Sequence, residues 1–250
     1  MSRRPSQILG PQPYDPEEDG PQRFFNAPGV VVGLAAMLAL IHLAMTFLDP
    51  QTRFLVDAYV GLAPVRFGAE GDGGLAELGG ALFSHALLHG DWVHYGFNAL
   101  WLIAFGAPVA TRLGARAGGA AGFYGSSLFV SLFMSAAAAG GAMFLALHWG
   151  EATILVGASG GVSGLLGALT RFGFRRPSPF DDPRRLTEMN DRTVVALTVV
   201  FVLTNVAVAL APNLLAGGRA VAWEAHVGGY LFGMTAFPLF HRARPRMRGV

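Results

Sequence analysis

Gly157-Ala158-Ser159-Gly160-Gly161-Val162-Ser163-Gly164-Leu165-Leu166-Gly167 is an apolar run that carries a serine near its start. Together with its flanking residues, the run predicts a membrane-spanning helix over residues 156–173. Ser159 would lie near the N-terminal end of that span. The other spans therefore decide whether this serine has a chemical partner.

The composition is typical of a membrane protein. Of the 250 residues, 52% are hydrophobic and only 14% are charged, and the mean hydropathy is +0.44. The chain has no cysteine, which excludes disulfides, thiolate metal sites and a cysteine nucleophile.

Six segments are apolar and long enough to cross a bilayer, which takes about 20 residues. They are residues 29–48, 92–110, 120–147, 156–173, 194–211 and 222–241. We therefore expect an all-α membrane protein whose residues 29–241 form one six-helix domain. The long connection over residues 49–91 is expected to lie in the membrane interface.

The arginines predict the orientation of this bundle. All 18 basic residues are arginine, and cytosolic loops retain such residues. With the N-terminus inside, fifteen arginines fall in inner segments and three in outer ones. We expect both termini in the cytosol, with residues 1–28 as a flexible tail and 242–250 as a basic tail. The pI near 9.4 then reflects topology, so no nucleic-acid partner is indicated.

Ionisable groups inside spans are costly and point to function. His94 and Asn98 are four residues apart in the second span, so both project from one helix face and can approach a single oxygen atom. The alternative is that they supply polar contacts between helices. His42 stands alone in the first span and is expected to bond a neighbouring helix.

His85 and His89 share the four-residue spacing, which raises the question of a metal. A zinc protease of the H-E-x-x-H type needs a carboxylate between its two histidines, and only apolar residues lie there. We expect neither a metal nor another cofactor, and interpret this pair as structural groups at the outer membrane boundary.

The sixth predicted span holds His226 beside small residues. Gly229 and Gly233 have the spacing by which helix backbones approach closely, and Gly160 is part of a matching set in the fourth span. We expect these glycines, with Gly157, to bring His226 within hydrogen-bond reach of Ser159.

This pair suggests nucleophilic catalysis. His226 could take the Ser159 proton during attack and return it to the leaving amine. The developing oxyanion needs preorganised donors, which His94, Asn98 and the free N–H groups at the start of the serine helix could supply. Glu224 precedes His226 by two residues and points away on a helix. We therefore predict a Ser–His dyad whose imidazole is oriented by packing.

These residues resemble the rhomboid family of intramembrane serine proteases. The resemblance rests on three motifs in order, over about residues 83–240: His94-x-x-x-Asn98, Gly157-Ala158-Ser159-Gly160 and Ala225-His226-Val227-Gly228-Gly229.

The resemblance implies a six-helix core with a site below the outer surface, and cleavage of single-span or multi-span membrane proteins that approach from the bilayer between the second and fifth helices. It also implies that Ser159 is the nucleophile, His226 the general base, and His94, Asn98 and the Ser159 N–H the oxyanion site. Ser163 lies in a second G-x-S-G sequence one turn deeper, and we interpret it as a packing residue.

Two other functions remain to be compared. A catalytically silent rhomboid-like protein would bind transmembrane helices without cutting them, but it would be expected to lack Ser159 or His226. A transporter with proton-relaying histidines should show repeats and carboxylates at the centre of its spans, and the sequence has neither. Arginine usage and abundant alanine and glycine suggest the plasma membrane of a bacterium with a GC-rich genome.

Overall fold

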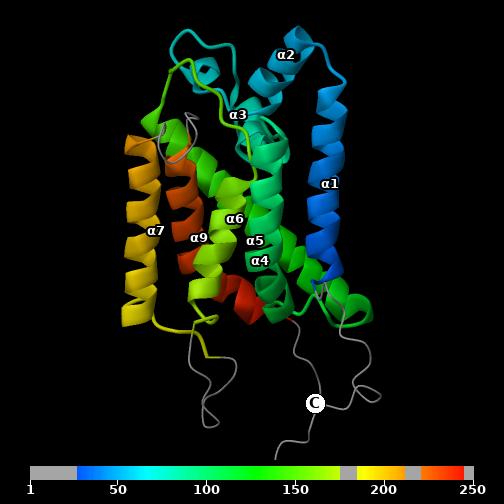
Figure 1. Ribbon diagram of the computed structural model, residues 1–250, viewed down its shortest axis with the longest axis vertical. Coiled ribbons are helices and arrows are strands. Elements are labelled where there is room, and N and C mark those ends of the chain that lie inside the picture. The colour runs from blue at the N-terminus through cyan, green and yellow to red at the C-terminus, as the bar shows by residue number, and fades with distance from the viewer. Residues whose placement is uncertain (1–26, 175–184, 212–220, 245–250) are drawn as a thin grey trace, which may run out of the picture.

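The computed structural model describes residues 27–174, 185–211 and 221–244, and within them the secondary structure is helical apart from one isolated β-bridge. The expected tails at residues 1–28 and 242–250 fall mostly outside the described residues. Long helices run side by side along the molecule, and short ones gather at one end (Figure 1). The long helices are α1 (Gly29–Thr46), α4 (Trp92–Arg112), α5 (Gly119–Leu147), α7 (Arg192–Leu210) and α9 (Trp223–Ala243), with the shorter α6 (Ser159–Thr170) among them.

Each of these six helices overlaps one of the six expected spans. Among the described residues, four are long and apolar enough to cross a membrane, namely α1, α4, α5 and α7. The expected helix over residues 156–173 is shorter than predicted, because α6 occupies only 12 residues. The residues before it are extended, with Leu155 in an antiparallel bridge to Leu62.

The connection between α1 and α4 contains four short helices at one end of the molecule. They are α2 (Pro50–Val60), η1 (Pro64–Phe67), α3 (Leu75–Ser84) and η2 (His85–Leu87). Asp49 starts α2 by accepting hydrogen bonds from the N–H groups of Gln51 and Thr52, which are otherwise unpaired at a helix start. Arg53 on α2 donates to the carbonyls of His89 and Gly90, at 3.1 and 2.7 Å. These bonds tie α2 to the chain just before α4.

Helix α6 lies in the centre of the bundle, packed against α4, α5 and α9. Ten of its 12 residues are buried, and its Leu165 joins Leu102, Phe129 and Phe237 in the main apolar cluster. A second cluster at the end with the short helices contains Leu62, Phe67, Phe144, Leu155 and Ala225. The start of α6 therefore lies between two apolar clusters, in the interior of the protein.

Candidate active site

The chain before Ser159 is held in a fixed path by backbone hydrogen bonds. Leu62 and Leu155 exchange N–H···O bonds of 3.0 and 2.8 Å, and the Gly157 N–H donates to the His85 carbonyl at 2.9 Å. Gly157 has φ +133°, a conformation that favours glycine. A Cβ at this position would also lie 2.8 Å from the His94 ring. Glycine is required at residue 157 for both reasons.

This path makes Ser159 the first residue of α6. The N-cap residue, Ala158, provides no side-chain hydrogen bond, and the first helical bond runs from Val162 N to Ala158 O at 3.0 Å. The N–H groups of Ser159 and Gly160 therefore precede the helical ladder and carry the positive end of the helix dipole. Ser159 itself is partly exposed, whereas Ser163 is buried.

Helix α4 brings His94 to the same point. Asp91 starts this helix and accepts from the N–H of His94 at 2.9 Å. The position of a Cβ on Gly157 is 2.8 Å from His94 Nε2 and 3.7 Å from Ser159 Oγ, so the ring and the hydroxyl are neighbours. The Gly90 N–H donates to His94 Nδ1 at 3.5 Å, which assigns the proton of the neutral ring to Nε2.

Asn98 lies one turn further along α4 and is buried. Its Nδ2 donates to the carbonyl of His94 at 2.9 Å, within the same helix. This bond uses one amide hydrogen and fixes the side chain next to His94, while the second amide hydrogen remains for another acceptor.

Close backbone contact joins α6 to α9. A Cβ on Gly229 would overlap the Gly160 carbonyl, and one on Gly233 would overlap the Gly164 carbonyl. Ala225, next to His226, also approaches this contact, since its carbonyl would lie 3.3 Å from a Cβ on Gly160. The first turn of α9 is therefore pressed against the first turn of α6, which begins with Ser159.

His226 is partly exposed in the first turn of α9, and its Nδ1 lies 2.8 Å from Oδ1 of Asn205 on α7. We expected packing to orient this imidazole, and the structure adds a side-chain hydrogen bond to that packing. Sequence reasoning missed Asn205. The available signal was an amide within an otherwise apolar span. The structure places no hydrogen bond between Ser159 Oγ and His226.

His85 and His89 brace the chain that leads to Ser159. His85 Nε2 lies 3.3 Å from the Ala137 carbonyl on α5, and His89 Nε2 accepts from the Ala158 N–H at 3.5 Å. Burial lowers the pKa of His85 to about 4 and that of His89 to about 3. Both rings are therefore neutral near pH 7. Among the described residues, no three His, Cys, Asp or Glu side chains are placed to hold a metal ion.

His42 contacts its neighbours through its ring. It is buried, and it packs edge-to-face on Trp92 with a centroid separation of 4.6 Å. Its expected hydrogen bond to another helix is not found in the described part of the chain. His42 is thus part of an aromatic cluster at the start of α4.

Glu224 bonds a histidine other than His226. Its Oε1 accepts from His148 Nε2 at 3.1 Å, and the other nitrogen of the His148 ring lies 2.7 Å from Glu151. The hydrogen bond to Glu151, followed by that to Glu224, raises the pKa of His148. This contact ties the beginning of α9 to the end of α5 beside the candidate site.

Comparison with known proteins shows the family of the chain. A search of curated protein sequences gives no match. The family model of the Rhomboid domain matches residues 79–243, which include α4, α5, α6, α7 and α9 and all the candidate site residues. This match covers more than half of the chain, and four helices in the described part of the chain are long and apolar enough to span a bilayer. The chain therefore belongs to the rhomboid family of integral membrane proteins.

Proposed function

We propose that this chain is an active serine endopeptidase that hydrolyses peptide bonds in the transmembrane segments of other membrane proteins. The observation that carries the proposal is the position of Ser159 at the uncapped start of α6, beside His94. A nucleophile, a histidine on an adjacent helix and free N–H donors are the parts that acyl transfer requires.

In the proposed mechanism, Ser159 Oγ attacks the substrate carbonyl while its proton passes to Nε2 of His226. The oxyanion accepts hydrogen bonds from the Ser159 N–H, His94 Nε2–H and the Asn98 amide. The C–N bond then breaks and His226 gives the proton to the leaving amine, which leaves an acyl-enzyme. Water attacks this ester, His226 takes the water proton, and Ser159 Oγ is released with that proton.

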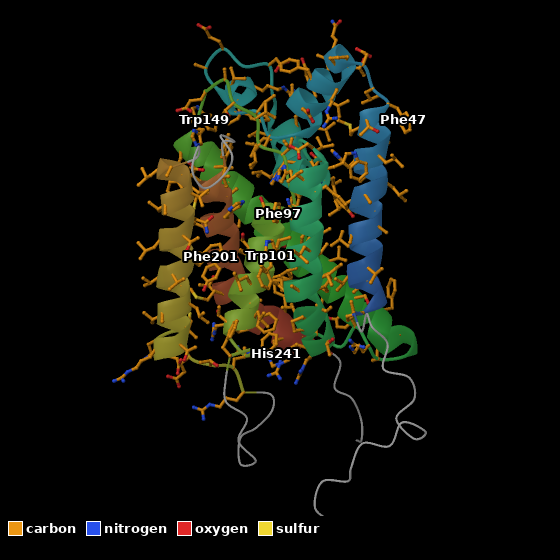
Figure 2. The ribbon with its side chains drawn as sticks, viewed as in Figure 1. Phe47, Phe97, Trp101, Trp149, Phe201 and His241 are labelled. Carbon is orange, nitrogen blue, oxygen red and sulfur yellow. The ribbon has the colours of Figure 1, made fainter. Side chains whose placement is uncertain are left out.

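Substrates would reach this site from the bilayer between α4 and α7. Phe97 and Trp101 on α4 are 60% and 46% exposed, and α7 packs on α9 and α6 rather than on α4. Figure 2 shows Phe97 and Trp101 on the α4 side and Phe201 on the α7 side of the region in front of α6. An apolar face of this kind suits a transmembrane segment.

The proposed topology has six spans and both termini in the cytosol of a bacterium. Arg112, Arg171, Arg192 and Arg242 lie at helix ends opposite the end that carries α2. Arginine is retained on the cytosolic side, so Ser159 would face the outer half of the plasma membrane.

The test is cleavage of a single-span substrate by the full chain in liposomes. We expect cleavage by the wild type, none by Ser159→Ala or His226→Ala, and labelling of Ser159 by a fluorophosphonate probe. Cleavage that persists in both variants would refute the mechanism, and labelling at Ser163 would refute the choice of nucleophile. Binding of the substrate without cleavage by the wild type would identify a silent rhomboid-like protein.

A further inference from the structure

Asn205 is a buried polar residue of α7. Only Val194 and Asn205 are buried among the 19 residues of this helix. An amide in a span is costly unless its groups are paired, and both polar atoms of Asn205 have partners, on α7 itself and on α9.

The hydrogen bonds fix which way the amide points. Asn205 Nδ2 lies 2.9 Å from the Phe201 carbonyl, which can only accept a hydrogen bond. The amide nitrogen must therefore face Phe201, and Oδ1 faces Nδ1 of His226 at 2.8 Å. Because Oδ1 can only accept, the proton between these two atoms belongs to His226 Nδ1.

This assignment determines the reactive nitrogen of His226. In the neutral ring, a proton on Nδ1 leaves the lone pair on Nε2. A general base must have its lone pair on the nitrogen that faces the nucleophile. The opposite tautomer would place a proton on that nitrogen, and the ring could not accept the hydrogen of Ser159.

The face of α7 that carries Asn205 is held against α9 by further side-chain contacts. Thr198 Oγ1 lies 2.9 Å from the hydroxyl of Tyr230, and the Phe201 ring stacks on the Tyr230 ring at 4.4 Å. Thr198, Phe201 and Asn205 follow the spacing of one helix face. These contacts set the position of the amide along the helix relative to His226.

We propose that Asn205 is a positioning residue for peptide hydrolysis, which holds His226 in the tautomer and orientation of a general base. The proposal rests on the proposed function and extends it, because it adds a third group to the Ser159–His226 pair. Asn205 does not touch the substrate. It accepts from Nδ1–H both in the neutral ring and in the imidazolium that forms when the Ser159 proton is transferred.

The kinetic test compares Asn205→Ala, Asn205→Asp and Thr204→Ala in the full chain, with kcat, KM and the melting temperature measured for each. Thr204 is the matched control, since it is the exposed neighbour of Asn205 on the same helix. We expect Asn205→Ala to lower kcat about 10- to 100-fold with KM changed less than about twofold. Asn205→Asp keeps an acceptor oxygen and should recover part of kcat, and Thr204→Ala should match the wild type.

A second measurement does not depend on activity. Nitrogen-15 chemical shifts of the histidine ring, assigned with His226→Ala, show which nitrogen carries the proton. We expect the proton on Nδ1 in the wild type and a mixture of tautomers in Asn205→Ala.

Four results are then distinguishable. A proton on Nε2 in the wild type overturns the proposal even if Asn205→Ala fails to fold. A kcat of Asn205→Ala within twofold of the wild type, with cleavage otherwise intact, overturns it while the proposed function stands. No recovery in Asn205→Asp over Asn205→Ala, at equal melting temperatures, also overturns it. A chain that cuts nothing, but shows an Asn205-dependent Nδ1–H, refutes the proposed function alone.

Discussion

Helix α9 contacts α6 and α7 in opposite ways. Towards α6 the contact is made by backbone on backbone, with glycines on both helices and ten buried residues in α6. Towards α7 the contact is made by side chains, and only two of the 19 residues of α7 are buried. The first contact sets the distance of His226 from Ser159, while the second supplies the amide that orients its ring. Distance and orientation therefore depend on different parts of the molecule.

The largest effect is expected when the α6–α9 contact is opened. Gly229→Val would place its side chain on the Gly160 carbonyl, and overpacking of this kind costs about 1–3 kcal/mol or more. We expect a loss of cleavage of about 100-fold and a lower melting temperature, although no catalytic atom is removed. Gly33→Val is the control, because a Cβ on Gly33 has no neighbour within 4 Å. Full activity with an unaltered melting temperature would show that close approach here is unimportant.

A smaller effect is expected on the α7 side. Phe201→Ala removes the ring stacked on Tyr230, a contact of a type that contributes about 0.5–1.5 kcal/mol. We expect activity to fall several-fold as Asn205 loses its fixed position, and the melting temperature to fall by a few degrees. Val199→Ala provides the comparison, since Val199 is 49% exposed on the same helix. Equal losses in the two variants would mean that the Phe201 stack does not hold α7 in place.

A pH-dependent effect is expected at the start of α9. The hydrogen bonds to Glu151 and then Glu224 raise the pKa of His148 above its ordinary value of 6.5. Its contribution to stability is therefore complete below pH 6.5 and is lost as the pH rises through the raised pKa. Thermal unfolding between pH 6 and 9 should show this loss in the wild type. The decline should be smaller in His148→Gln, and identical curves would refute the role of His148.

The smallest effect is expected for Tyr230→Phe. This change removes the hydroxyl that bonds Thr198 at 2.9 Å but keeps the ring against Phe201. Hydrogen bonds between membrane helices contribute about 0.6 kcal/mol on average. A cycle with Thr198→Val should give a coupling free energy near that value. A coupling above about 2 kcal/mol would show that α7 is held by this hydrogen bond more than by the aromatic stack.

The helices could be predicted from the sequence because their signals are local. Apolar length locates six segments that each overlap a helix, and among the described residues four of these helices are long and apolar enough to cross a membrane. The spacing of Gly229 and Gly233 indicates which face of α9 can approach another backbone. Helix α6 begins at Ser159 and not at residue 156, where the expected span starts. The chain before Ser159 is extended instead, because Gly157 has a positive φ and Leu155 forms a bridge with Leu62. Hydropathy does not detect a bridge between residues so far apart in sequence.

Within the candidate site, the residues on one helix were easier to find than those joined across helices. His94 and Asn98 can be recognised from their four-residue spacing in the sequence, because both lie on α4. Asn205 and His226 come from different helices, and no interval in the sequence connects them. The contacts of His85 with the Ala137 carbonyl and of His89 with the Ala158 N–H likewise depend on which backbone groups the fold places near these rings. Tertiary contacts of this kind could not be read from residue types alone.

The short length of α6 has a consequence for where a bond can be cut. Twelve residues of α-helix are about 18 Å long, whereas the hydrocarbon layer is about 30 Å thick. If the inner end of α6 reaches the inner boundary, as in the proposed topology, Ser159 stands about 12 Å below the outer one. The length of α6 then determines how far Ser159 lies below the outer membrane boundary. Lengthening α6 by one turn would raise the cleavage position by about 5 Å, towards residues of the substrate nearer the surface.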